Sequence, residues 1–400
     1  MSGIDLMHAC QARGSLATAT SLHTIVRHDE FAKSHLMTSM AADIKVRDFR
    51  IRPIEFKLER PIDTGGGVIR SWPVILLDLH TDAGIVGVSF AGCFLPMLLN
   101  PMVAMLESLG EMLHGDTLSP KEMDAKLRSM ARLIGVQGPL AMAVAMIEIA
   151  AWDALAKAAG LPVCRLLGSA PRPIPLYKTV SAMLPQRVEE LSRQALERGY
   201  AGIKLKLGHA DARLDFDLIE AARGCCGADF PIMVDFNQAL SVPEAIRRLR
   251  SMDELGLQWF EEPVDAMNHT GQARVAHAVR TPVSLGENWH SPAEGEQHMR
   301  SGAADLIMPD LIAIGGVSAW MQTAAMAELH GIPVSSHSYT ELSAHLLAAT
   351  PMAHWAEHVS VFERLLLEPA RPVGGALIAS DRPGFGIEWN EDAIRHSQVN

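Results

Sequence analysis

The sequence lacks the basic excess and the long apolar runs that would place it on nucleic acid or in a membrane. Its 35 Lys and Arg residues stand against 46 Asp and Glu, for a net charge of −11. Because phosphate backbones are bound by concentrated positive charge, this balance argues against a nucleic-acid partner. No apolar run reaches the roughly 18 residues that a spanning helix needs, so no membrane association is expected.

Cysteine is scarce and shows no pattern that suggests disulfides or zinc. The five cysteines are odd in number and have no CxxC spacing, which is typical of a reduced, cytoplasmic protein without structural zinc. The first forty residues lack the basic and apolar regions of a signal peptide. They are either a loosely attached extension or an addition upstream of a natural start at Met37 or Met40.

Two kinds of pattern divide the rest of the chain. Residues 44–82 read as strands with an Asp-Ala-Gly turn, and residues 95–115 and 138–160 read as helices, which predicts an α+β domain. From Ile174 onward, about eight short apolar runs recur at roughly 20–30-residue intervals with amphipathic helices between them. No glycine-rich phosphate loop follows the first run, so a barrel of βα units is favoured over an open sheet.

The run "GIKLKLG" carries two lysines, Lys204 and Lys206, at a spacing that puts both on one face of a strand. On an edge strand such a pair would simply discourage aggregation. At the mouth of a barrel, both ammonium groups would instead point toward an active site.

Acidic residues end three later runs of the series. Asp235, Glu261 and Glu287 each follow an apolar stretch, so a barrel would bring their carboxylates together at one mouth. Three converging carboxylates repel one another unless a cation lies between them, and Mg²⁺ prefers such oxygen ligands. A single Mg²⁺ site is therefore predicted.

Lys206 and His337 are the candidate proton-transfer groups on either side of that site. Lys204 is expected to lower the pKa of Lys206, because a neighbouring like charge disfavours protonation. Asp310, one strand before His337, is expected to orient the imidazole by a hydrogen bond. The alternative for His337 is a buried core histidine beside Ser335 and Ser336.

Together these motifs resemble the enolase superfamily, and specifically its mandelate racemase group, from about Ile44 to Trp389. The resemblance rests on the segments "AAWDALAKAAGLPVCRLLG", "GIKLKLG", "VDFNQ", "WFEEP", "GEN", "MPDLIAIGGVSAW" and "GIPVSSHSYTELSAHLLAATPMAHWAEH". It implies an α/β fold, a modified TIM barrel (β/α)7β with an N-terminal α+β capping domain. The implied domains are an extension that is expected to be poorly ordered (residues 1–43) and a capping domain (44–168). They are followed by the barrel (169–360) and by a segment that completes the capping domain (361–400).

The resemblance also implies roles for individual residues. It makes Asp235, Glu261 and Glu287 the Mg²⁺ ligands, and Lys206 and His337 the bases on opposite faces of the substrate. It implies that a protonated Glu357 hydrogen-bonds the reacting carboxylate, and that Lys204 lies near the same group. The substrate-binding positions it suggests are Thr179, Asn237 and two cap residues, Arg70 and Phe94.

The cap loops Ile62–Trp72 and Gly92–Phe94 are expected to choose the substrate. The implied partner is a small-molecule carboxylate, and the implied assembly is a homo-oligomer of up to eight copies.

Three functions are consistent with these residues. The first is a Mg²⁺-dependent racemase or epimerase that removes the proton alpha to the carboxylate of a mandelate-like α-hydroxy acid through an enediolate. The second is an acid-sugar dehydratase that uses the same metal site and His–Asp pair. The third is a catalytically silent barrel that acts as a binder.

Overall fold

The computed structural model describes residues 44–64 and 67–398. The predicted extension, residues 1–43, lies outside the described residues. The predicted domain boundaries at 168/169 and 360/361 stay predictions.

The first part of the described chain, residues 44–166, is a three-stranded antiparallel sheet covered by helices. The sheet has the order β1-β2-β3, and the helices follow it in sequence. These elements are β1 (Val46–Thr64), β2 (Gly67–Thr81), β3 (Val86–Gly92), η1 (Pro96–Leu98), α2 (Leu99–Leu113), α3 (Pro120–Met130), α4 (Gly138–Ala158) and α5 (Val163–Leu166). The predicted Asp-Ala-Gly turn joins β2 to β3, with Gly84 at φ +75°.

Helix α4 packs directly against β3. A Cβ atom on Gly87 would lie 2.0 Å from the carbonyl oxygen of Ala150, so only glycine permits this approach. By length and composition α4 could cross a membrane, yet 72% of its apolar window is buried inside the protein. It ends before Gly160, whose left-handed φ of +66° stops the helix as predicted.

The second half is the predicted (β/α)7β barrel. Its named parallel strands are hydrogen-bonded in the order β10-β4-β5-β6-β7-β8-β9. They are β4 (Ile174–Val180), β5 (Gly202–Lys206), β6 (Ile232–Asp235), β7 (Phe260–Glu261), β8 (Val283–Leu285), β9 (Leu306–Ile307) and β10 (Ala356–His358).

The seventh strand of the barrel is reduced to isolated parallel bridges. Val334 pairs with Ile307 on one side and Ala353 on the other, which closes the ring between β9 and β10. Regular pairing stops after His337, because Ser338 and Tyr339 both adopt left-handed backbone conformations at φ +52° and +46°. The apolar run Ile332–Ser338, one of the roughly eight runs expected from the sequence to form barrel strands, is thus in the right place but is shorter than an ordinary strand.

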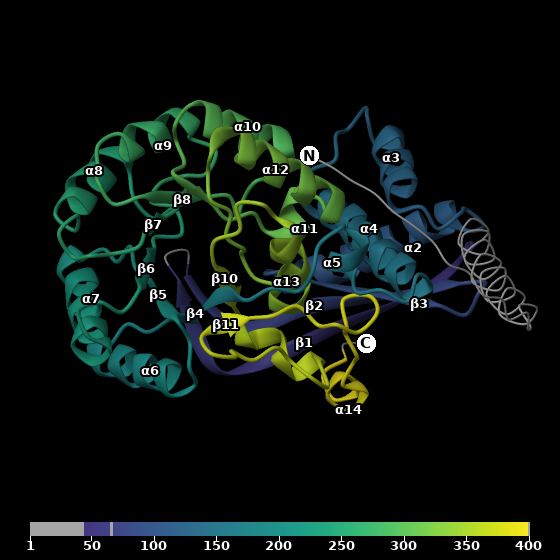
Figure 1. The fold of residues 1–400 in the computed structure, drawn as a ribbon, viewed down its shortest axis with the longest axis horizontal. Helices are drawn as coiled ribbons and strands as arrows, with labels where there is room; N and C mark the ends of the chain where they lie inside the picture. Colours follow the sequence, from purple (N-terminus) through teal and green to yellow (C-terminus); the bar gives the residue numbers. More distant parts are fainter. Residues whose placement is uncertain (1–43, 65–66, 399–400) are drawn as a thin grey trace, which may run out of the picture. The chain divides into compact units, whose positions relative to one another are not determined.

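Helices cover the outside of the ring and alternate with its strands, as Figure 1 shows for α6 to α10. Several begin with a side chain that caps the first turn, such as Ser241, which accepts a hydrogen bond from the Glu244 amide. The helices are α6 (Pro185–Glu197), α7 (Ala212–Cys226), α8 (Val242–Arg250), α9 (His269–Ala276), α10 (Pro292–Arg300), α11 (Leu311–Ile314), α12 (Val317–His330) and α13 (Thr340–Ala349).

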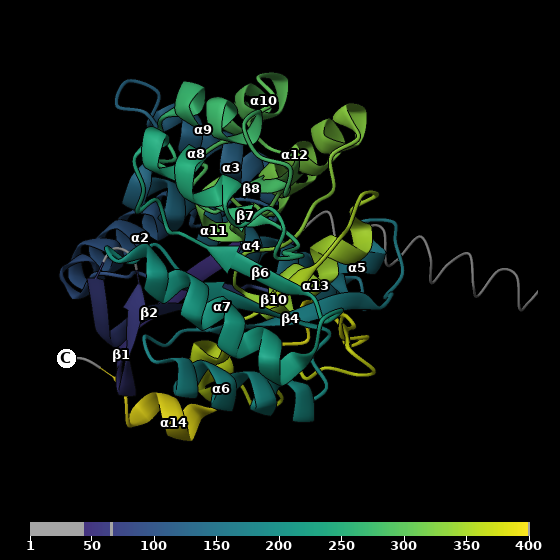
Figure 2. The same cartoon turned by 90° about the vertical axis from the view of Figure 1, so that its left-hand side faces the viewer.

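The C-terminal elements return to β1 and β4. They are η2 (Ser360–Leu365), β11 (Ala376–Leu377) and α14 (Glu391–Arg395). Strand β11 pairs with β4, and α14 lies near the sheet that contains β1 and β2 (Figure 2). Buried Arg52 of β1 holds this end of the chain through an ion pair of 2.9 Å with Glu391.

A buried carboxylate joins α4 to the barrel. Glu148 accepts hydrogen bonds from the backbone amides of Val317 (2.8 Å) and Ser318 (3.0 Å) at the start of α12. The first amides of a helix have no partner within the helix, so Glu148 supplies one. Burial raises the pKa of Glu148 to about 7, although these amides act in the opposite direction.

Candidate active site

The carboxyl ends of three adjacent strands bring the predicted polar residues side by side. In the register of the sheet, Lys206 of β5 is paired with Asp235 of β6, which is paired with Glu261 of β7. Glu287 follows β8 after Gly286, where the backbone turns at φ +135°. A Cβ atom on Gly286 would lie 3.1 Å from the backbone of Met308, so this turn needs glycine.

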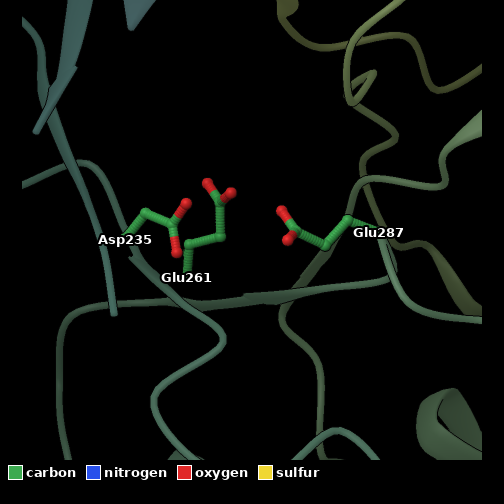
Figure 3. Close-up of side chains that lie close together, drawn as sticks. All are labelled: Asp235, Glu261 and Glu287. Atoms are coloured by element: carbon green, nitrogen blue, oxygen red, sulfur yellow. The ribbon is translucent and has the colours of Figure 1, made fainter. Parts of the chain in front are cut away.

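The three carboxylates converge on one point. Asp235, Glu261 and Glu287 each offer an oxygen, and these oxygens lie within 4.8 Å of one another. Figure 3 shows the three side chains directed toward a shared space. Asp235 and Glu261 are fully buried.

The electrostatics of this cluster fit a divalent cation. The pKa of Glu261 lies well above its usual range, mainly because of burial and then because of the neighbouring charge of Asp235. One Glu287 oxygen is buried without a hydrogen bond among the described residues, 3.5 Å from His337 Nε2. Clustered carboxylate oxygens of this kind suit a hard cation such as Mg²⁺ better than zinc.

Lys204 lies beneath the cluster as a buried counter-charge. Its Nζ donates to Glu261 Oε1 at 2.6 Å and lies 2.8 Å from Glu357 Oε1. Burial alone would lower the pKa of Lys204, but the two glutamates hold it well above its usual range. Lys204 therefore stays positively charged between the two glutamates.

Lys206 reaches the Asp235 end of the cluster. Its Nζ donates to Asp235 Oδ2. Burial, the largest influence, lowers the pKa of Lys206, and so does Lys204 as predicted, but the charges of Asp235, Glu287 and Glu261 together outweigh them and the net shift is upward. The expected lowering of this pKa is therefore not found, because the lysine is paired with a carboxylate one strand away.

His337 reaches the Glu287 end of the cluster, and Asp310 holds it there as predicted. The distance from His337 Nδ1 to Asp310 Oδ2 is 2.8 Å. The other oxygen of Asp310 accepts the amides of Ile312 and Ala313, so the start of α11 fixes the carboxylate. Burial opposes protonation of His337, but Glu287 and Asp310 raise its pKa to about 9.

Glu357 is held by three donors from three elements. Thr179 donates to Oε1 at 2.5 Å, Lys204 lies 2.8 Å from the same oxygen, and the Ser338 amide donates to Oε2 at 2.9 Å. Burial would raise the pKa of Glu357, but Lys204 and His337 hold it below its usual range. The protonated Glu357 expected from the sequence is thus not the form that these contacts favour. The hydroxyl of Thr179, a position expected to bind substrate, is thus directed toward Glu357.

Asn237 lies within the cluster, whereas the structure shows no hydrogen bond between the two cap residues and the described residues of the cluster. The Asn237 amide donates to Asp235 Oδ1 at 2.7 Å, and its side chain reaches Glu287 Oε1 at 3.5 Å. Phe94 is 52% exposed and packs edge-on against Trp72, with ring centroids 5.5 Å apart. Arg70 is exposed on β2, and no hydrogen bond links it to the site residues that the structure describes.

Two contributors were not predicted. Trp259 donates its indole N–H to Glu261 Oε2 at 3.1 Å, and Ser338 donates its amide to Glu357. Trp259 stands two residues before Glu261 on the same strand face, so strand alternation could have identified it. The contact of Ser338 depends on its left-handed backbone, which no sequence pattern signals.

Two family models match most of the chain. Residues 46–168 match the N-terminal domain of mandelate racemase/muconate lactonizing enzymes, and residues 186–393 match an enolase C-terminal domain-like model. The fold and site therefore define a member of the enolase superfamily. More narrowly, the chain belongs to the mandelate racemase/muconate lactonizing enzyme family.

Individual relatives differ in the reaction that their names describe. An L-talarate/galactarate dehydratase of Salmonella typhimurium is 32% identical over 337 residues, which cover 82% of this chain and 83% of that protein. A D-galactarolactone cycloisomerase of Agrobacterium fabrum is 29% identical and covers 88% and 98%. A Bradyrhizobium enolase crystallised with magnesium and mandelic acid is 37% identical, with a TM-score of 0.86 and coverage of 90% and 99%.

Proposed function

We propose that this protein is a Mg²⁺-dependent dehydratase of acid sugars. The observation that carries this proposal is the placement of Lys206 and His337 at opposite ends of one carboxylate cluster. The dehydratase and cycloisomerase relatives act, by name, on sugar acids and their lactones. The dehydratase alternative from the sequence thus replaces the racemase as the first proposal.

Asp235, Glu261 and Glu287 would hold the Mg²⁺ ion. When bound, the ion would act as a Lewis acid that stabilises negative charge developing on the substrate carboxylate. Lys204 adds a fixed positive charge from below, since its Nζ contacts Glu261 and Glu357. A positive group that is already in place when charge develops needs no reorganisation during the reaction.

Lys206 and His337 would divide the proton transfers between them. Lys206, which the neighbouring carboxylates favour in the protonated form, would first release its own proton to solvent. Its neutral Nζ would then take the proton from the carbon alpha to the carboxylate, and the electron pair would form the double bond to the beta carbon. His337 would donate the proton on Nε2 as the bond from that carbon to its hydroxyl breaks, which releases water. The resulting enol would then take a proton at the beta carbon and become a 2-keto-3-deoxy acid.

Asp310 would keep His337 in the orientation that this step needs. It binds Nδ1 and leaves Nε2 directed toward Glu287 and the cluster. Since α11 fixes the other oxygen of Asp310, the imidazole has little freedom to rotate away.

The second candidate is a racemase or epimerase of an aromatic α-hydroxy acid. It is supported by the exposed ring of Phe94 next to the cap loop and by the mandelic acid bound in the Bradyrhizobium structure. In this reaction Lys206 and His337 would exchange protons with one carbon from opposite faces. No hydroxyl would leave.

A substrate screen with two readouts separates the candidates. Galactarate, L-talarate, other sugar acids and both mandelate enantiomers would be incubated with and without Mg²⁺, with keto-acid detection and polarimetry in parallel. The proposal expects a 2-keto acid from at least one sugar acid, dependent on Mg²⁺ and abolished by Lys206→Ala. Loss of optical rotation from mandelate without any keto acid would favour the racemase, and silence in both assays would favour a binding protein.

We also propose a cytoplasmic location and a homo-oligomeric assembly. The four cysteines in the described part of the chain are all unpaired, which suits a reducing compartment. The loop between α3 and α4 exposes Leu133 (92%) and Ile134 (82%), and a contact between subunits would cover these apolar side chains. Cell fractionation and light scattering after size-exclusion chromatography test the two proposals.

A further inference from the structure

The segment after His337 contains two residues in an unfavourable conformation. Ser338 and Tyr339 follow one another at φ +52° and +46°, and neither is glycine. Consecutive left-handed residues without glycine persist only where surrounding contacts enforce them. The contacts of Tyr339 are therefore informative.

Tyr339 is anchored to the cap. Its hydroxyl accepts a hydrogen bond of 3.1 Å from the backbone amide of Gly92, at the end of β3. Its ring stacks on Phe362 with centroids 5.3 Å apart and an interplanar angle of 15°, and it packs against Phe90 of β3 at 5.4 Å. Only 2% of Tyr339 is exposed.

The cap end of this contact is the predicted substrate loop. Gly92 is followed directly by Cys93 and by Phe94, whose φ of +55° turns an exposed ring outward. A Cβ atom on Gly92 would lie 2.9 Å from the Trp72 indole nitrogen, so the strand before the loop is tightly confined. Phe94 is thus only two residues from the amide that donates to Tyr339.

The barrel end of the contact is the proton-transfer site. Tyr339 is two residues from His337, and the intervening Ser338 donates its amide to Glu357. The Ser338 hydroxyl lies 3.4 Å from His337 Nε2. Burial, followed by the charge of Asp310, raises the pKa of Tyr339 well above its usual range, which is consistent with a phenol lying near the partner of His337.

We propose that Tyr339 is a positioning residue that couples the cap loop Gly92–Phe94 to the orientation of His337. This inference rests on the proposed function, because it assigns His337 a role in proton transfer. It predicts that contact of a substrate with Phe94 changes the orientation of His337. The orientation of Lys206 should not change, because its contacts come from within the barrel.

The test compares Tyr339→Phe with Tyr200→Phe in the full-length protein. Both substitutions remove one buried phenol hydroxyl, and that of Tyr200 bonds His358 Nδ1 at 2.8 Å and not a residue of the cap. The first readout is the histidine side-chain NMR spectrum, with the His337 signal assigned by its loss in His337→Asn. We expect Tyr339→Phe to shift the His337 ring signals and Tyr200→Phe to leave them in place.

The second readout is kinetic, on whichever substrate the screen identifies. We expect Tyr339→Phe to lower kcat about fivefold to tenfold with KM nearly unchanged, and Tyr200→Phe to change neither. If Tyr339→Phe lowers only the melting temperature and leaves both the His337 signals and kcat unchanged, Tyr339 is purely structural and the proposal fails. Because the NMR readout needs no substrate, it decides this inference even if the enzyme proves not to be a dehydratase.

Discussion

The two ends of the carboxylate cluster are built in different ways. At the Lys206 end, the lysine and its partner Asp235 are strand residues paired in register, and among the described residues their contact is made within the barrel. At the His337 end, the imidazole depends on Asp310 and on a strained turn that is tied to the cap through Tyr339. The first end is a local product of sheet geometry, whereas the second depends on the junction of cap and barrel.

This difference suggests a division of labour. A group fixed by strand register keeps its position whatever substrate the cap accepts. A group fixed through the cap can respond to which substrate is bound. Variants that act on one end alone therefore test the comparison.

The largest effect is expected from removing the two groups in turn. Lys206→Ala and His337→Asn should each lower kcat for dehydration about 10³-fold, since each removes a positioned proton-transfer group. Their exchange behaviour should differ. In D₂O, His337→Asn should still exchange the α-proton of the substrate but should not eliminate water. Lys206→Ala should neither exchange the α-proton nor eliminate water. Proton NMR follows both processes. Equal loss of exchange in both variants would contradict the assigned roles.

A large pH-dependent effect is expected at the cap junction. The pKa of Glu148 is raised by burial from 4.5 to about 7, so between these values the native state binds more protons than the unfolded state. Stability should therefore fall as pH rises through this window, by about 3 kcal/mol in total. Glu148→Gln mimics the protonated form and should lose this slope in urea unfolding between pH 4.5 and 7. Parallel profiles for the two proteins would show that Glu148 does not titrate in this way.

A smaller effect is expected at the orienting carboxylate. Asp310→Asn can still cap α11, because asparagine is also a good N-cap, so stability should change little. It should lower kcat roughly 10²-fold, because the amide no longer favours the charged imidazolium. Kinetics and thermal melting of the same preparation separate the two effects. If activity fell only as much as stability did, Asp310 would act mainly as the N-cap of α11 and not by orienting His337.

The smallest effect is expected at the Lys206 end, from a contact to the carboxylate cluster. Trp259→Phe removes the indole donor to Glu261 and should weaken Mg²⁺ binding about tenfold by calorimetry. Trp320→Phe is the matched control, since that buried indole bonds Thr350 on the outside of the barrel. Equal affinities in the two variants would show that Trp259 only fills space.

Local patterns predicted the Lys206 end of the site well. Strand alternation placed Lys204 and Lys206 on one face, and the strand ends placed Asp235, Glu261 and Glu287 together. The lowering effect of Lys204 on the pKa of Lys206 was predicted, but the larger opposing effect of the neighbouring carboxylates was not, because it depends on distances that the sequence does not contain. The short helix α3 was also not predicted, because its buried face consists of just three residues, Pro120, Met123 and Leu127, which is a weak periodic signal.

The His337 end of the site was harder to predict from the sequence. The pairing of His337 with Asp310 was predicted, but the contacts of Tyr339 and Glu148 were not. Gly92 and Tyr339 are 247 positions apart in the chain, and Glu148 and Val317 are 169 apart. Contacts of this kind depend on how two folded layers meet, which periodicity within each layer does not specify.

The carboxylate of Glu148 also has a consequence for protein engineering. A chimaera that replaced residues 44–168 by the matching part of a relative would change the substrate loops, but it would also replace the acceptor for the first amides of α12. A donor cap without an acidic residue at this position would leave those amides buried and unpaired, at a cost of about 1–3 kcal/mol each. Successful exchange of specificity between relatives therefore requires matching this one residue before any loop is redesigned.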